Sequence, residues 1–302
     1  CKIMTPEDVY ILCRIFHFVA VMFMFGLSCS AAILAKEKFV PLIQVRLRPA
    51  LAISTITVFV STYLWMIVQS GIMGDGWQDA WSLTIWQAVL GTSFGQIWQW
   101  QLVLSSLALI ALFIHQRSIR NISLLLISTL MLVLHAFIGH SAMFTGSEAV
   151  IYKLNQSIHL ISGAYWFGGL WPFVVCLQFL RNKDELADGM IKPIIATMKR
   201  FSLFGHFAVL LVIASGIVSA IMLLPGWPAT TQLSSEYQSM LWLKIAFVAL
   251  MLGLALVNRY VLVPHIRKKN NFQWLLINSW FELLLGTMVI LTVAIFAINS
   301  PV

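Results

Sequence analysis

The sequence predicts an all-α integral membrane protein, a bundle of about eight transmembrane helices. Of its 302 residues, 60% are hydrophobic and only 10% are charged, whereas a folded soluble domain takes about a quarter of its residues from Asp, Glu, Lys and Arg. The mean hydropathy is +0.89. Because so few charges cannot cover a soluble globule of this size, we expect lipid to be the solvent of this chain.

The apolar residues gather in stretches long enough to cross a bilayer, which takes about 20 residues at about 1.5 Å of rise each. Helices satisfy their own backbone hydrogen bonds in lipid, and these stretches are too long and too continuously apolar for barrel strands. No loop could hold a separate soluble domain, so we expect residues 1–302 to form a single polytopic domain. The expected spans are about 9–35, 49–72, 96–115, 120–141, 154–180, 200–223, 240–264 and 274–298.

The distribution of charge predicts the orientation. Lysines and arginines follow the first, third, fifth and seventh spans, whereas the alternate loops hold mainly acidic residues, with Lys153 as their base. By the positive-inside rule the basic loops are cytoplasmic and both termini are periplasmic. The net charge of +8 is therefore a topology signal, and we expect the lipid bilayer and no nucleic acid among the partners.

The cysteines do not predict a disulfide framework. Cys1, Cys13, Cys29 and Cys176 are scattered and show no CxxC spacing, so we interpret them as small buried hydrophobes. The chain begins at Cys1 without a methionine, and we expect that an upstream residue or segment has been removed or left out.

Ionisable side chains inside the spans are the candidates for function. Each costs several kcal/mol in lipid unless it is paired or solvated. Arg14 and Lys244 are close enough to the outer surface to extend their charges into it, and Arg259, beside Asn258, is interpreted as an anchor at an inner helix end. Glu282 lies deeper, and we expect it to pair with His206 or Arg259 or to carry a proton. The full set is Arg14, His17, His135, His140, His159, His206, Lys244, Arg259 and Glu282.

Four of the histidines, His17, His135, His140 and His159, fall in the outer half of the predicted bundle. We expect His17, His140 and His159 to converge in one pocket beneath the outer surface. His135 and His140 are five residues apart, about 140° around one helix, so we do not expect them to share a metal, and we favour His140.

Two methionines lie close in the sequence to two of the outer histidines. Met143 lies three residues beyond His140, and Met24 lies two helical turns beyond His17. Imidazole suits copper in either oxidation state and thioether selects Cu(I). The combination predicts a copper site, with Met143 and Met24 as assisting ligands.

A series of short motifs follows the predicted spans in order: Arg14-Ile15-Phe16-His17, Gly139-His140, Ile158-His159-Leu160, Trp166-Phe167-Gly168-Gly169-Leu170, Phe201 with Gly205-His206-Phe207, Lys244, Asn258-Arg259-Tyr260 and Glu282. In these motifs the chain resembles the copper resistance protein D family (CopD/PcoD type) over nearly its whole length. This resemblance implies copper handling at the inner membrane of a Gram-negative bacterium, with a CopC-type periplasmic copper-binding protein as a partner. It marks His17, His140, His159, His206 and Glu282 as the functional set.

The first hypothesis is a copper permease without enzymatic activity, which receives Cu(I) or Cu(II) at the outer histidines and passes it inward toward His206 and Glu282. The chain contains no Walker motif, so a gradient or mass action would drive the movement. The alternative is a membrane oxidoreductase that binds haem b between two histidines, such as His17 with His159 or His140 with His159. A third hypothesis is a scaffold whose buried histidines are purely structural.

Overall fold

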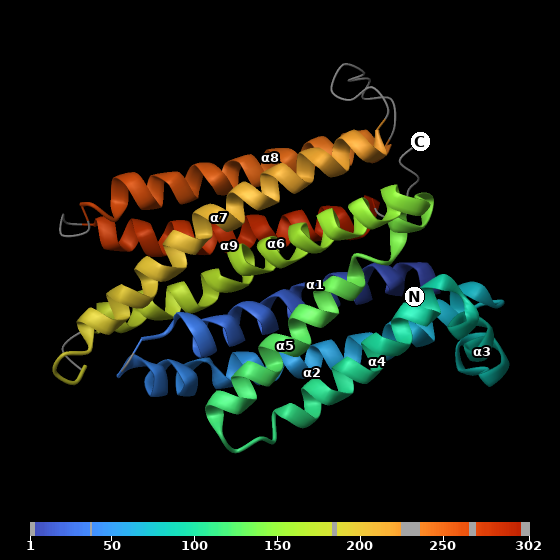
Figure 1. The fold of residues 1–302 in the computed structure, drawn as a ribbon, viewed down its shortest axis with the longest axis horizontal. Helices are drawn as coiled ribbons and strands as arrows, with labels where there is room; N and C mark the ends of the chain where they lie inside the picture. The colour runs from blue at the N-terminus through green and yellow to red at the C-terminus, as the bar shows by residue number, and fades with distance from the viewer. Residues whose placement is uncertain (1–3, 37, 183–185, 225–235, 266–269, 297–302) are drawn as a thin grey trace.

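The computed structural model describes residues 4–36, 38–182, 186–224, 236–265 and 270–296, and within these ranges no residue is in a strand. The long helices lie side by side along one direction (Figure 1). The predicted class is therefore confirmed. The long helices are α1 (Pro6–Cys29), α2 (Phe39–Met73), α4 (Ser93–Ala111), α5 (Arg117–His135), α6 (Gly146–Arg181), α7 (Ile191–Leu223), α8 (Glu236–Val257) and α9 (Asn271–Phe296).

Shorter elements complete the chain. A 3-10 turn, η2 (Asp79–Trp81), and the short helix α3 (Leu83–Gly91) lie between α2 and α4, and η3 (Gly139–Met143) lies between α5 and α6. Two π-helical segments, η1 (Ser30–Leu34) and η5 (Asn258–Leu262), continue α1 and α8. Both π-segments locally widen the helix that they extend.

Seven of the helices in the described part of the chain are long and apolar enough to cross a membrane. The expected span at 96–115 corresponds to α4, which is not among the seven. Its first half contains Gln96, Gln99 and Gln101, and these polar side chains lower its hydropathy. The count of eight crossings therefore stays a prediction.

One predicted boundary is wrong, because the fourth span ends earlier than residue 141. Helix α5 ends at His135 and the backbone turns at Gly139, whose φ of +76° favours glycine. His140 and Met143 consequently lie in η3, outside α5. Side chains three residues apart eclipse one another in a 3-10 helix, so these two residues still lie on one side of their turn.

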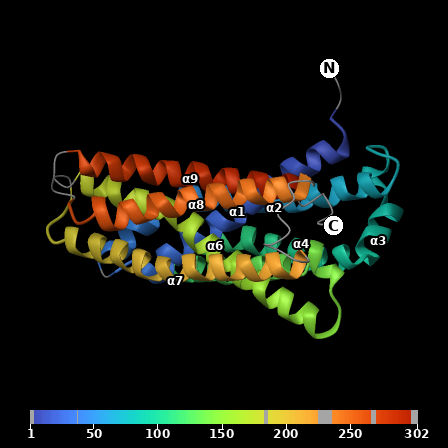
Figure 2. The same cartoon turned by 90° about the horizontal axis from the view of Figure 1, so that it is seen from above.

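Helices α1 and α6 run through the middle of the bundle in both ribbon views (Figures 1 and 2). Helix α1 packs against α2, α5, α6 and α9, and α6 packs against α5, α7 and α9. The two helices meet at Gly26 and Gly168, where a Cβ on Gly168 would lie 2.1 Å from the Met22 carbonyl oxygen. Only glycine permits this approach, so the sequence fixes the crossing point.

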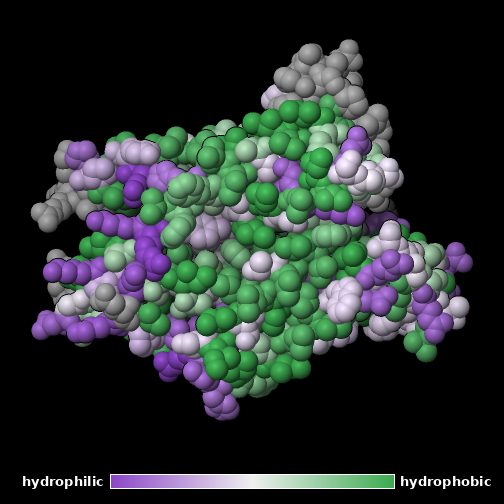
Figure 3. All heavy atoms as spheres, in the orientation of Figure 1, coloured by the Kyte–Doolittle hydropathy of each residue, from purple (hydrophilic) through white to green (hydrophobic). Residues whose placement is uncertain are grey.

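The start of α1 and the end of α9 lie at the same end of the bundle, beside α3 (Figure 1). Thr5 caps α1 at that end, because its hydroxyl accepts from the Asp8 amide at 3.4 Å while the Asp8 carboxylate accepts from the Thr5 amide at 3.1 Å. The space-filling view shows a broad hydrophobic band across the middle and hydrophilic residues gathered toward the two ends (Figure 3). This is the distribution that a membrane-spanning bundle requires.

Candidate metal centre

Two imidazole rings, one from α1 and one from the end of α5, are in near contact inside the bundle. The ring centroids of His17 and His135 are 5.0 Å apart, and the two side chains are 0% and 7% exposed. The rings of Phe18, Trp65 and Trp98 surround them, each with its centroid within about 6 Å of at least one imidazole. The pair is enclosed by aromatic walls contributed by α1, α2 and α4.

Two hydroxyl groups of α2 orient His17. Its Nδ1 lies 3.0 Å from Ser61 Oγ and 3.4 Å from Thr62 Oγ1. Both hydroxyls already donate their protons to the Val58 carbonyl, at 3.1 and 2.7 Å. With those protons on Val58, the hydroxyls accept from the ring. We therefore assign the His17 proton to Nδ1 and the lone pair to Nε2.

A backbone carbonyl orients His135 in the same way. Its Nδ1 lies 2.6 Å from the Met131 carbonyl oxygen, which can only accept. The side-chain amide nitrogen of Gln101, Nε2, lies 2.9 Å from the same ring nitrogen and donates to the Met131 carbonyl at 3.0 Å. Because the Met131 carbonyl is the nearer neighbour of Nδ1 and can only accept, we assign the His135 proton to Nδ1 and the lone pair to Nε2.

The two Nε2 atoms are buried and have no hydrogen-bond partner among the residues that the structure describes. Because both carry lone pairs, they cannot donate to each other, and a buried polar atom without a partner costs about 1–3 kcal/mol. A metal ion would use both lone pairs. Histidine ligands to metals typically donate their other ring N–H to a carbonyl or another acceptor, which fixes the tautomer. Both rings already have that arrangement.

A cationic side chain, Arg14, and a third histidine, His140, lie on the outward side of the His17–His135 pair. Arg14 precedes His17 by one helical turn, and its guanidinium lies 5.6 Å from the Tyr10 ring centroid and 5.9 Å from that of Trp65. It does not extend freely into solvent, since its Nε is buried and unpaired. Burial, and to a lesser extent the charge of Arg14, lower the pKa of half-buried His140. Both effects favour the neutral form of His140. Met143, three residues further along η3, is 54% exposed.

His159 lies elsewhere, at the contact between α6 and α7. Its Nδ1 is 2.9 Å from Ser215 Oγ, and the charge of Lys244 on α8 acts on it. One turn earlier, Asn155 donates to the Ser215 carbonyl at 3.0 Å and to Ser219 Oγ at 2.9 Å. This polar seam joins α6 to α7.

The predicted convergence of His17, His140 and His159 in one pocket is therefore wrong. Within the described ranges, no three His, Cys, Asp or Glu side chains are grouped closely enough to hold a metal ion. The imidazole next to His17 is that of His135. The sequence analysis favours His140 over His135 as a metal ligand, because it places both residues on one helix, where they would point in different directions. Met24 is fully buried in the apolar core, two turns beyond His17.

The inner polar residues also pair differently from the expectation. Glu282 is 3% exposed and accepts from Asn258 Nδ2 at 2.6 Å, while Asn278 Nδ2 donates to Asn258 Oδ1 at 3.0 Å. His206 is exposed and lies 3.3 Å from the Tyr260 hydroxyl. The Glu282 carboxylate is thus hydrogen-bonded to the Asn258 amide of η5 and to the Trp166 side chain of α6, and not to His206 or Arg259. This network ties η5 to α9.

The fold and the buried imidazole pair define a polytopic α-helical membrane protein with a candidate metal centre near one end of its bundle. Residues 4–150 match the copper resistance protein D-like N-terminal domain, and residues 195–296 match the copper resistance protein D family model. The chain belongs to the copper resistance protein D family.

Two relatives support the assignment. "Inner membrane protein YebZ" of Escherichia coli (strain K12) is 35% identical over 294 residues, which cover 97% of this chain and 98% of that protein. "Copper resistance protein D" of Pseudomonas syringae pv. tomato is 33% identical over 145 residues, 47% of this chain and 46% of that protein. No solved structure matches the chain significantly. The protein is a multi-pass inner-membrane protein related to copper resistance.

The comparisons do not support the haem alternative, and the geometry disfavours it. A haem held between His17 and His135 needs a slot for the whole macrocycle between the rings. Here the ring centroids are 5.0 Å apart, and the space around them is filled by Phe18, Trp65 and Trp98. His159, the second ligand in both predicted haem pairs, has its contacts on α7.

Proposed function

We propose that this protein binds copper on the Nε2 atoms of His17 and His135 and moves it across the inner membrane without ATP hydrolysis. The observation that carries the proposal is the pair of buried, unpartnered Nε2 atoms, each with its ring fixed through Nδ1. Imidazole is a ligand for copper in both oxidation states. Two nitrogen ligands without a charged ligand fit Cu(I), which accepts low coordination numbers.

The His17–His135 site is suited to reversible binding of copper. Two neutral ligands hold copper less tightly than a closed cage of four, and movement through a membrane requires binding that is both favourable and reversible. His140 and Met143 in η3 are the proposed capture ligands at the entrance, where Met143 is exposed. A CopC-type protein in the periplasm is the proposed donor. Met24, seven residues beyond His17, is the proposed next ligand inward.

Cu(I) titration of the purified protein against a chromophoric Cu(I) chelator tests the proposal. His17→Ala and His135→Ala should each remove one bound copper and the Cu–N signal from the X-ray absorption spectrum. His115→Ala, a histidine outside both rings' contacts, is the matched control and should leave the stoichiometry unchanged. Variants are compared only if they elute as the wild type does in gel filtration.

Copper transport is measured with proteoliposomes that contain the protein in their membrane and a Cu(I) chelator inside. The wild type should accumulate copper, and His135→Ala should do so no faster than empty vesicles. Unchanged copper binding in both histidine variants would overturn the site. Intact binding with no copper movement in the wild type would favour a scaffold role over transport.

A further inference from the structure

A small cavity lies at the end of the bundle opposite to the imidazole pair, between η1, α6 and α7. Its volume is about 10 Å³, and its lining includes Ser30, Cys176, Thr197 and Met198. This is about the space that one water molecule or ion needs. Cys176 lies five residues before the cytoplasmic end of α6, roughly 8 Å along its axis.

Two backbone irregularities create this space. Ser30 is the first residue of the π-helix η1, where the helix is widened. Pro172, one turn before Cys176, has no N–H to donate and kinks α6. On the side toward the membrane centre, Phe201 packs directly on Gly169, where a Cβ would lie 2.4 Å from its ring. The cavity is thus built into the backbone and closed by an aromatic ring.

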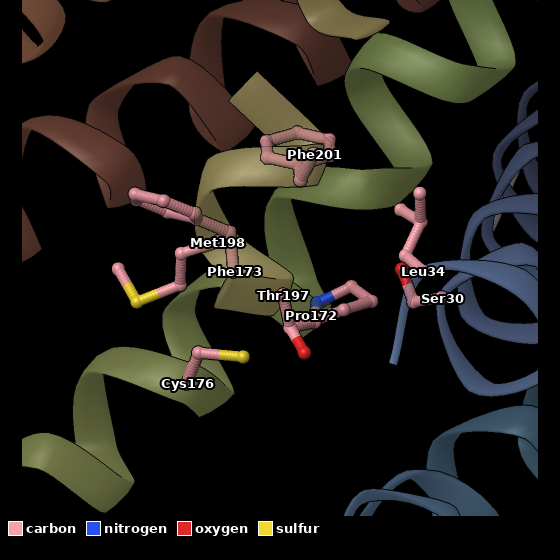
Figure 4. Close-up of a pocket in the computed structure, with 8 residues that line it drawn as sticks. All are labelled: Ser30, Leu34, Pro172, Phe173, Cys176, Thr197, Met198 and Phe201. Carbon is pink, nitrogen blue, oxygen red and sulfur yellow. The ribbon is translucent and has the colours of Figure 1, made fainter. Parts of the chain in front are cut away.

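The side chains that line the cavity include two sulfur atoms. Cys176 is a free thiol that is 2% exposed, and Met198 brings a flexible thioether from the facing helix. Ser30, also in the lining, is 2% exposed. Figure 4 shows the Cys176 sulfur and the Ser30 oxygen pointing into the space between the helices.

The cationic side chain near the cavity, Arg200, already has hydrogen-bond partners. Arg200 donates to the carbonyls of Ile33 and Leu34 at 2.8 and 3.2 Å, so its guanidinium is held at the end of η1. Thr197 donates its proton to the Pro193 carbonyl at 2.9 Å and can only accept from the cavity side. No acidic side chain is among the residues that line the cavity. A hard divalent cation would therefore lack the oxygen ligands it prefers.

We propose that the cavity lined by Cys176 and Met198 is a second, inner Cu(I) site. Thiolate and thioether are the ligands that select Cu(I). On binding, the S–H bond of Cys176 breaks, an S–Cu bond forms, and the proton passes to water at the cytoplasmic surface; no atom changes oxidation state. The thiolate offsets the charge of the ion, so the buried pair is neutral. This inference rests on the proposed function, since it takes copper as the cargo.

X-ray absorption separates the two sites, because sulfur and nitrogen ligands scatter differently. With Cu(I) supplied from a chelator, the wild type should bind two ions and show both Cu–S and Cu–N signals. The double variant His17→Ala/His135→Ala should keep one ion with sulfur ligands only. Adding Cys176→Ala to it should remove that ion, and adding Met198→Leu should weaken binding roughly 10–100-fold.

Cys29→Ala is the matched control, because Cys29 is also buried but does not line the cavity. It should leave the Cu–S signal unchanged. Cys176→Ser, which keeps the size and polarity of the side chain, guards against a folding defect and should also lose the signal. Absence of Cu–S scattering in the wild type overturns the inner site and leaves a water-filled cavity. Its survival in Cys176→Ala combined with Met24→Leu and Met143→Leu, which removes the outer thioethers, does the same. Survival of the Cu–N signal in the double histidine variant instead overturns the outer site alone.

Discussion

At the scale of single residues, the candidate centre depends on side chains that orient the two imidazoles. Ser61 and Thr62 accept from His17 Nδ1 because their own protons are engaged by Val58. They determine which nitrogen of His17 faces its neighbour. Loss of such orienting partners typically lowers metal affinity by about 10–100-fold.

We therefore expect the double variant Ser61→Ala/Thr62→Val to bind Cu(I) roughly 10–100-fold more weakly at the outer site. The measurement is the Kd from competition with a chromophoric chelator. Ser106→Ala removes a hydroxyl of α4 that lies 2.9 Å from the Tyr63 hydroxyl of α2 and has no contact with the histidines, and it should leave the Kd unchanged. Equal affinities in all three proteins would show that the hydroxyls do not orient the ligand.

A second expectation concerns the pH at which the His140 imidazole becomes protonated. Burial and the charge of Arg14 lower the pKa of His140 from its ordinary 6.5. A lowered pKa means that the ring stays neutral, and able to bind copper, to a lower pH than free imidazole. Arg14→Gln should raise the pKa toward 6.5, since it removes a nearby positive charge.

The titration can be followed by NMR of protein labelled with ¹³C-histidine, with the His140 signal assigned by its loss in His140→Asn. A midpoint below pH 6.5 in the wild type, shifted upward in Arg14→Gln, is the expected result. A midpoint that Arg14→Gln leaves in place would rule out the charge effect.

Sequence reasoning finds the ionisable residues of the site but not their grouping. His17 and His135 are both identifiable as histidines in apolar spans, yet their pairing requires the packing of α1 against α5. Ser61, Thr62 and Gln101 are not predicted, although buried polar residues in apolar helices are a usable signal. The prediction misplaces His140 because α5 already ends at His135 and the backbone turns at Gly139 with a positive φ angle, which a hydropathy pattern does not report.

At the scale of elements, the crossing of α1 and α6 is held by two glycines. A Cβ on Gly26 would lie 2.1 Å from the backbone carbon of Gly168. Gly26→Ala should push the helices apart and destabilise the protein by about 1–3 kcal/mol. The measurement is thermal or detergent-induced unfolding of the purified protein.

Gly163→Ala on the same α6 is the control. A Cβ there meets nothing within 4 Å, and alanine favours a helix by up to about 1 kcal/mol over glycine. Its stability should be unchanged or slightly higher. If Gly26→Ala were as stable as Gly163→Ala, the two backbones would not be in close contact.

The sequence predicts the long helices well because the apolar stretches that lipid requires are visible residue by residue. Local departures are harder to predict. The π-helices at Ser30 and Asn258 leave no signature in the hydropathy of their segments.

At the scale of the whole molecule, the positive-inside rule predicts that both termini are periplasmic, which requires an even number of crossings. Helix α4 decides the count. Fusions of alkaline phosphatase after Gly74 and after Gln116 test it, since the enzyme is active only outside the cytoplasm. We expect activity after Gly74 and none after Gln116. Activity at both positions would mean that α4 does not cross.

The Gly26–Gly168 crossing also limits how the bundle can move. The two family models match residues 4–150 and 195–296, and α1 belongs to the first while α6 lies between them. Separating the two backbones at this point would leave an empty gap in the middle of the bundle and lose its close packing. For the copper movement proposed above, we therefore expect rearrangements of side chains and helix ends around this crossing, and not a rocking of one half of the bundle against the other.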